Sequence, residues 1–100
     1  SVAHHLGVSG FATHAVLDAR SLVAVGRDVP ADIAAVLGCA VLTGGGAVLN
    51  AGRPKPGQAI AIVGLGGVGM AALLVARSLP GVTVVGVDSN SDKVELARSA

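Results

Sequence analysis

The most regular pattern of apolar and polar positions in the chain lies in residues 59–88. A short β-branched run, 60–63, has the length of one buried strand. A glycine-rich stretch follows it, and the next apolar residues recur at helical spacing until a Pro-Gly pair ends the helix. A second apolar run, 82–87, ends at Asp88. This pattern predicts a strand, a glycine loop, a helix and a second strand, in that order.

The first part of the chain shows shorter patterns. Residues 11–19 alternate between two faces and predict a strand, and residues 22–25 predict another. His14 would be a structural side chain on the first of these strands. The neighbouring His4 and His5 would point in different directions, so they make a poor metal chelate.

A helix is expected to begin near Pro30, which suits the first helical turn, and to continue over residues 31–37. Gly38 is expected to interrupt it, and residues 40–52 to resume it. The final helix starts at the capping residues that follow Asp88 and runs to the chain end.

Three consecutive glycines, 44–46, lie inside the second helical stretch, where each costs about 1 kcal/mol relative to alanine. They indicate a close approach, either by another helix or by a cofactor ring or the adjoining sheet. Cys39, judged by residue type alone, is most simply a small buried apolar side chain.

The glycine loop has the features of a phosphate-binding turn. Gly64 would permit the sharp turn out of the strand, Gly66 would let a pyrophosphate approach the backbone, and Gly69 would let the helix pack closely. The N–H groups of Gly67 and Val68 would point at the phosphates from the helix start. The stretch therefore predicts a dinucleotide site.

Asp88 sharpens that prediction, because it follows Gly64 at the interval typical of dinucleotide-binding units. Its carboxylate can accept hydrogen bonds from both ribose hydroxyls and would repel a 2′-phosphate, so it favours NAD over NADP. Glycine turns without a nucleotide, S-adenosylmethionine enzymes and flavoproteins are the alternatives with a similar loop.

Two uncharged runs, 33–49 and 59–76, reach the lower limit of a membrane span and raise the alternative of a two-helix hairpin. The first run is rich in glycine, and the chain has no Trp or Tyr to form an interfacial belt. We therefore interpret both runs as strands and helices of a parallel sheet buried on both faces.

Composition narrows the class further. Hydrophobic residues make up 52% of the chain, charged residues 13%, and the net charge is +1, which gives no indication of binding to nucleic acid or to an anionic membrane. Because the chain is so apolar, we expect much of its surface to be covered by parts of the protein outside this sequence. A single cysteine forms no internal disulfide and fits a reducing compartment, and no export leader is visible.

The run from Gly38 to Gly44, the GLGGVG loop and the GVDSNSDK stretch keep the mutual spacing found in zinc-dependent, medium-chain alcohol dehydrogenases, which the chain resembles over nearly its whole length. The resemblance implies an α/β fold with a partial Rossmann-type, doubly wound parallel sheet, preceded by the end of a GroES-like, β-rich catalytic domain. Residues 1–28 would end that catalytic domain, 29–57 would be linking helices, and 58–100 would begin the NAD-binding domain.

The resemblance also implies a role for each residue that matches the family's motifs. Cys39 would be one ligand of the catalytic zinc, and Thr43 would lie against the nicotinamide ring together with Val68. His5 and Leu6 would fall in the substrate pocket, where the family often has a bulky apolar residue instead of His5. The expected cofactor contacts, on pyrophosphate and adenosine ribose, are Gly64, Gly66, Gly67, Gly69, Asp88 and Lys93.

The implied reaction is transfer of hydride from an alcohol to NAD, with zinc polarising the alcohol oxygen, to give an aldehyde or ketone. The resemblance further implies a cytoplasmic homodimer or homotetramer acting on small-molecule substrates, with no nucleic acid or membrane partner. This chain alone is expected to be inactive. The alternative is a zinc-free, NAD(P)-binding relative of the quinone-reductase or nucleotide-sensing kind, against which Cys39 counts.

Overall fold

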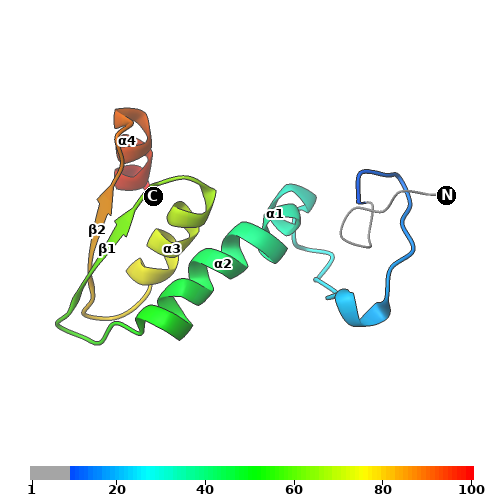
Figure 1. Ribbon diagram of the computed structural model, residues 1–100, viewed down its shortest axis with the longest axis horizontal. Helices are drawn as coiled ribbons and strands as arrows, with labels where there is room; N and C mark the ends of the chain where they lie inside the picture. Colours follow the sequence, from blue (N-terminus) through cyan, green and yellow to red (C-terminus); the bar gives the residue numbers. More distant parts are fainter. Residues whose placement is uncertain (1–9) are drawn as a thin grey trace.

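The computed structural model describes residues 10–100, which form a mixed α/β fold (Figure 1). The described elements, in chain order, are a 3₁₀ turn η1 (Ala19–Ser21), helix α1 (Ala31–Val36), π turn η2 (Leu37–Val41), helix α2 (Leu42–Gly46), π turn η3 (Ala47–Gly52), strand β1 (Ala59–Val63), helix α3 (Gly67–Arg77), strand β2 (Thr83–Val87) and helix α4 (Ser91–Ser99).

The two strands predicted in residues 11–25 are absent from the structure, so that prediction is wrong. A strand needs a hydrogen-bonding neighbour, and no described segment pairs with this one. His14 lies exposed in a bend, with Nδ1 3.2 Å from the hydroxyl of Thr13, and not on a strand face. The only regular structure here is the turn η1, whose start is capped by the carboxylate of Asp18.

A single 22-residue helix runs over Ala31–Gly52, because α1, η2, α2 and η3 follow one another without a break. The predicted interruption at Gly38 is therefore wrong: the chain makes a π turn there, in which the N–H of Leu42 donates to the carbonyl of Leu37. Pro30 lies just outside the helix as its N-terminal cap, one position earlier than expected.

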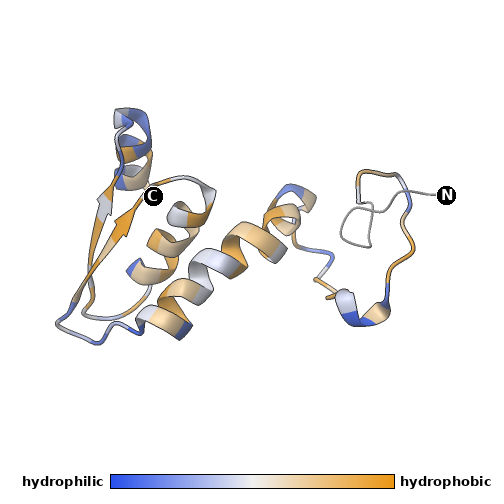
Figure 2. Ribbon diagram, in the orientation of Figure 1, coloured by the Kyte–Doolittle hydropathy of each residue, from blue (hydrophilic) through white to orange (hydrophobic). Residues whose placement is uncertain are grey.

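This helix is the one element of residues 10–100 that is long and apolar enough to cross a membrane, judged by length and composition. Its buried residues are Gly44, Gly45 and Val48, and α2 packs against α3. Figure 2 shows the helix as apolar or intermediate in hydropathy over most of its length, with hydrophilic residues toward its ends. The second uncharged run, 59–76, folds as a strand, a loop and nearly the whole of a helix, so the structure does not have the two-helix hairpin that was the less favoured alternative.

Strands β1 and β2 pair in parallel, with Ile62 opposite Gly86, and α3 connects them. The inward positions of the sheet face α3, and the helix containing α2 lies on the same side (Figure 1). The outward positions are exposed, Val63 by 82%. The expectation of a sheet buried on both faces is therefore wrong for the described part of the chain, where helices cover one face only.

The core lies between the inward face of this sheet and the helices. Its buried side chains are Val48, Ile62, Leu65, Ala72, Leu73, Ala76 and Ala97. Gly86 leaves space for two of them: a Cβ at this position would lie 3.2 Å from Leu65 Cδ2 and 3.3 Å from Leu73 Cδ1. The glycine in β2 thus lets the loop and α3 sit directly on the strand.

Candidate functional site

The glycine loop joins the carboxyl end of β1 to the start of α3. Gly64 has a φ of +92°, a left-handed conformation that glycine adopts without strain. Its N–H donates to the carbonyl of Val87, 2.7 Å away at the end of β2. The turn predicted from this glycine is confirmed, and the hydrogen bond ties the loop to the edge where both parallel strands end.

The two later glycines of the loop serve different purposes. No atom lies within 4 Å of the position that a Cβ on Gly66 would take, so the backbone is open to an approaching group. A Cβ on Gly69 would overlap the carbonyl oxygen of Gly64. Gly69 therefore permits close packing between the helix and the loop, as the sequence predicted, and Gly66 keeps the outer surface of the loop bare.

The start of α3 offers unpaired donors beside this bare surface. Its cap residue, Gly66, makes no side-chain capping bond. No acceptor within residues 10–100 receives the N–H groups of Gly67 or Val68 through a loop or side-chain hydrogen bond. The positive end of the helix dipole adds to these donors, so the loop is suited to an anionic group such as a phosphate.

Asp88 follows β2 and lies against the same loop. One carboxylate oxygen, Oδ2, accepts the N–H of Leu65 at 2.7 Å, and the other, Oδ1, accepts the N–H of Asn90 at 2.9 Å. The Nζ of Lys93, on the first turn of α4, is 3.9 Å from Oδ2. The side chain of Asp88 is only 9% exposed.

These contacts set the electrostatics of the carboxylate. The N–H of Leu65 lowers the pKa of Asp88 most, the N–H of Asn90 lowers it further, and Lys93 adds a smaller effect in the same direction. Partial burial opposes them. The net shift is downward, so Asp88 is an anion at neutral pH and is equipped to accept hydrogen bonds from hydroxyl groups.

The helix that carries Cys39 packs against the start of α3. A Cβ on Gly44 would overlap the carbonyl oxygen of Val68 and lie 2.8 Å from the nitrogen of Ala72. One turn earlier, Ala40 Cβ lies 3.8 Å from the Cβ position of Gly67. Gly44 therefore allows close packing of the two helices, as one of the alternatives expected, whereas a Cβ on Gly45 would lie 3.4 Å from Val75 Cγ2, an ordinary contact.

Cys39 and Thr43 immediately precede the two residues of this contact, Ala40 and Gly44, in the sequence. They are one helical turn apart, share one stripe of the helix and are both exposed. We call this helix–helix contact the seam: Ala40 and Gly44 form one side of it, and Gly67, Val68 and Ala72 at the start of α3 form the other. Cys39 and Thr43 are thus the residues next to the seam on the long helix. On α3, the seam residue Val68 is 44% exposed.

No group of three His, Cys, Asp or Glu side chains is close enough to hold a metal within the part of the chain that the structure describes. Cys39 is an exposed free thiol there, not the buried apolar side chain that its residue type alone suggests. One thiolate can fill one position of a tetrahedral zinc site. The described residues alone do not make such a site. His5 and Leu6, predicted for the substrate pocket, lie outside the described residues.

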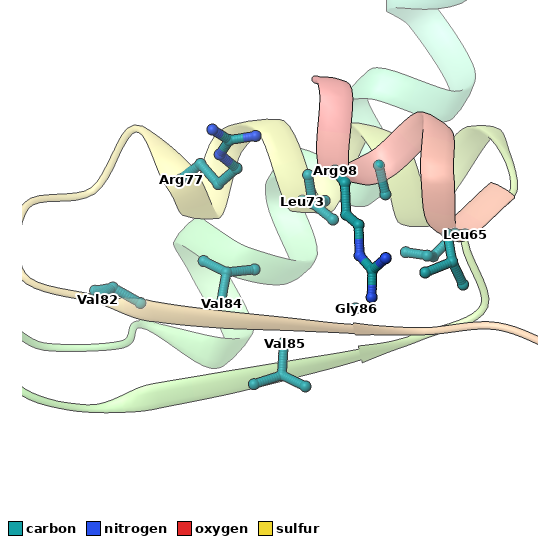
Figure 3. A pocket seen from close by; sticks show the side chains of 10 residues that line it. Leu65, Leu73, Arg77, Val82, Val84, Val85, Gly86 and Arg98 are labelled. Carbon is teal, nitrogen blue, oxygen red and sulfur yellow. The ribbon is translucent and has the colours of Figure 1, made fainter. Parts of the chain in front are cut away.

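A cavity of about 610 Å³ lies between α3, β2 and α4, and Leu65 of the glycine loop is among the residues that line it (Figure 3). Its floor is apolar, with Leu73, Val84 and Val94 among its lining residues. Arg77 and Arg98 stand at its rim, and Figure 3 shows Arg98 reaching from α4 toward β2. None of Cys39, Thr43 or Asp88 lines it, and it borders the candidate site through Leu65 and Gly86.

Two parts of the site were not predicted from the sequence. The backbone N–H groups of Leu65 and Asn90, which hold Asp88, carry no side-chain signature that a motif could reveal. The second is Gly86. A glycine within a run of β-branched residues indicates that another part of the chain packs closely against the strand there, and this signal was present in the sequence.

The fold and the site define a class: a parallel β–α–β unit whose glycine loop and terminal aspartate suit a dinucleotide. No protein-family model matches the chain. The chain is similar to alcohol dehydrogenases: it is 40% identical over 97 residues to alcohol dehydrogenase 1 of Pisum sativum and 42% over 98 residues to the class-3 enzyme of Myxine glutinosa. It is 44% identical over 91 residues to geraniol dehydrogenase of Castellaniella defragrans.

These similarities cover 97%, 98% and 91% of this chain but 26%, 26% and 24% of the respective relatives. The chain therefore spans about a quarter of the length of the curated relatives it matches. The predicted resemblance to medium-chain alcohol dehydrogenases is confirmed, and it is a resemblance to one segment of them.

Proposed function

We propose that this chain is the segment of an NAD-dependent alcohol dehydrogenase that begins the cofactor domain. The observation that carries the proposal is the bare, unpaired start of α3 beside the ionised Asp88 at the carboxyl edge of both strands. In this proposal residues 58–100 begin a Rossmann-type domain, 29–57 link it to a GroES-like catalytic domain, and 1–28 end that domain.

The reaction is hydride transfer from a small-molecule alcohol to NAD, which yields an aldehyde or ketone. The glycine loop holds the cofactor: the N–H groups of Gly67 and Val68 bind the pyrophosphate, and Gly66 allows it to approach. Asp88 accepts hydrogen bonds from the adenosine ribose hydroxyls, and Lys93 lies close enough to assist. Ionised Asp88 repels a 2′-phosphate, which makes NAD the preferred cofactor.

Thr43 lies against the nicotinamide ring in this proposal. The support is the sequence position of Thr43 next to Gly44, whose backbone packs against Val68 at the start of α3. The hydroxyl of Thr43 and the side chain of Val68 would fix the ring from the same side of the loop. The substrate pocket, with His5 and Leu6, would open in front of that ring.

Cys39 would contribute one ligand to a zinc ion whose other ligands would come from outside this chain. The support is its exposed thiol, one turn from Thr43 on the same helix stripe. Zinc bound in such a site supplies Lewis-acid polarisation of the alcohol oxygen. The role of Cys39 is to hold that charge beside the hydride acceptor.

The whole protein would be cytoplasmic and would act as a homodimer or homotetramer on small-molecule alcohols and aldehydes, with no nucleic acid or membrane partner. The isolated chain would be inactive, because its residues 10–100 supply a single candidate zinc ligand and two strands of the cofactor sheet. Alcohol-dependent NADH formation by the pure chain with added zinc would contradict this.

The test of cofactor binding is a titration of NADH and, separately, NADPH into the protein, followed by coenzyme fluorescence. The chain has no Trp or Tyr, so the segment itself adds no interfering emission. We expect saturable NADH binding and much weaker NADPH binding. Equal affinity for the two would contradict the role of Asp88, and binding of neither would contradict the proposed function.

A further inference from the structure

The carboxylate of Asp88 is occupied before any cofactor binds. Its two oxygens accept separate backbone N–H groups, from Leu65 at 2.7 Å and from Asn90 at 2.9 Å. The first of these donors belongs to the glycine loop and the second to the turn that starts α4. The side chain therefore connects two loops that leave the same edge of the sheet.

Leu65 is the point where this connection acts on the phosphate site. Its side chain is only 3% exposed and packs over Gly86, so the residue is anchored from both its side chain and its backbone. Gly66, Gly67 and Val68 follow directly, and they carry the bare surface and the unpaired donors. Fixing the peptide of Leu65 fixes the direction in which the next N–H groups point.

Glycine makes this anchoring necessary. Gly64 and Gly66 flank Leu65 and restrict the backbone less than any other residue type, so the loop gains little rigidity from its own sequence. A charge-assisted hydrogen bond to a largely buried carboxylate is among the stronger restraints a loop can have. Within residues 10–100 the loop is also tied to the sheet edge by a neutral backbone bond, from the N–H of Gly64 to the carbonyl of Val87.

We propose that Asp88 is a positioning residue for the phosphate loop, in addition to its role toward the ribose: its carboxylate holds the N–H of Leu65 and so presets the loop for a pyrophosphate. This inference rests on the proposed function. If it is correct, one side chain determines both the preference for NAD over NADP and the shape of the phosphate site. A substitution at Asp88 that admits a 2′-phosphate then also loosens the loop that binds every dinucleotide.

The test uses the isosteric Asp88→Asn substitution in the complete protein that carries this segment. An amide has one acceptor oxygen, so it cannot receive both the Leu65 and the Asn90 N–H groups as the carboxylate does. The first measurement is amide hydrogen exchange without cofactor. We expect exchange at Leu65 to accelerate by about tenfold or more, as for a lost hydrogen bond to a charged group, and by more than exchange at the core residue Ala76, which reports the change in global stability.

The second measurement is the affinity for inorganic pyrophosphate, which has no ribose, by displacement of NADH. Removing a negative charge would by itself strengthen anion binding. A role limited to the ribose therefore predicts equal or tighter pyrophosphate binding in the variant, whereas loss of the preset loop predicts weaker binding. The matched control is Asp92→Asn, an exposed acid on the same helix start, which should leave Leu65 exchange as in the wild type.

Unchanged exchange at Leu65 would overturn the proposal. Equal acceleration of exchange at Leu65 and Ala76 would also overturn it, because the substitution would then act through global unfolding alone. Equal or tighter pyrophosphate binding in Asp88→Asn would do the same. If the wild-type protein bound no NADH, the proposed function would fail, and Leu65 exchange would still decide whether Asp88 positions the loop.

Discussion

Residues 59–97 and residues 10–30 are both rich in apolar side chains, yet only the first region buries them. Ile62, Leu65 and Leu73 are at most 8% exposed, whereas Val16 is 97% and Val23 89% exposed. A β–α–β unit supplies its own strand partner and its own covering helix within a short stretch of chain. The first region has neither among the described residues. Apolar composition alone therefore does not make a core, and nearby partners do.

The largest effect should come from the core of the first region. In Leu73→Ala we expect a loss of about 2–5 kcal/mol in the free energy of unfolding, toward the lower value because Leu73 borders the cavity and its neighbours can relax. Urea denaturation followed by circular dichroism measures it. A loss like that of an exposed site would mean that α3 is not packed on the sheet in solution.

The contact between the long helix and α3 should be the next most sensitive feature. Gly44→Ala places a Cβ against the backbone of Val68 and Ala72, and we expect a loss of about 1–3 kcal/mol. Gly38→Ala is the matched control, because nothing lies within 4 Å of its Cβ position. This change should be neutral, or stabilise by up to about 1 kcal/mol through helix propensity. Equal changes in the free energy of unfolding for the two substitutions would contradict close packing of the long helix on α3 at Gly44.

Lowering the pH should destabilise the β–α–β unit through protonation of Asp88. Its pKa is lower in the folded than in the unfolded protein, where it is near the ordinary 3.8, so its stabilising contribution is present above that pH and lost as pH falls through the lower folded value. Asp88→Asn should therefore be less stable than the wild type at neutral pH. The difference should shrink below about pH 4, measured as denaturation midpoints across pH. A difference independent of pH would contradict this.

The smallest effect is expected in residues 10–30. Phe11→Ala removes an aromatic ring that contacts no core in the described chain, and we expect a change within about 0.5 kcal/mol. The same denaturation experiment applies. A loss comparable to that of Leu73→Ala would show that this region is folded against the rest, and it would remove the contrast between the two.

The elements of the β–α–β unit were predictable to within a few residues because glycine and capping residues mark their ends. Gly64 adopts the expected turn, and Asn90 caps α4 by accepting the N–H of Asp92. The strands expected in residues 11–25 failed because alternation describes a face without showing whether a partner exists. The break expected at Gly38 failed because the unfavourable helix propensity of one glycine is smaller than the packing of the whole helix on α3.

The candidate site was predictable where side-chain chemistry defines it and not where backbone geometry does. The glycine loop and Asp88 follow from their spacing, and the structure brings them together. The links from Asp88 to Leu65 and Asn90 depend on two N–H groups that every residue type except proline carries. The roles of Cys39, Thr43 and Lys93 toward a cofactor or metal remain proposals.

The π turn at Leu37–Val41 has a consequence for how this helix tolerates insertions and deletions. A π turn holds one more residue than an α-helical turn, so it has the form of a single-residue insertion accommodated without breaking the helix. Removing one residue from it should restore α-helical geometry and rotate everything before it, including Asp32, relative to the seam at Gly44. The turn is thus a point where the length of the helix can change while Gly44, outside the turn, keeps its contact with α3.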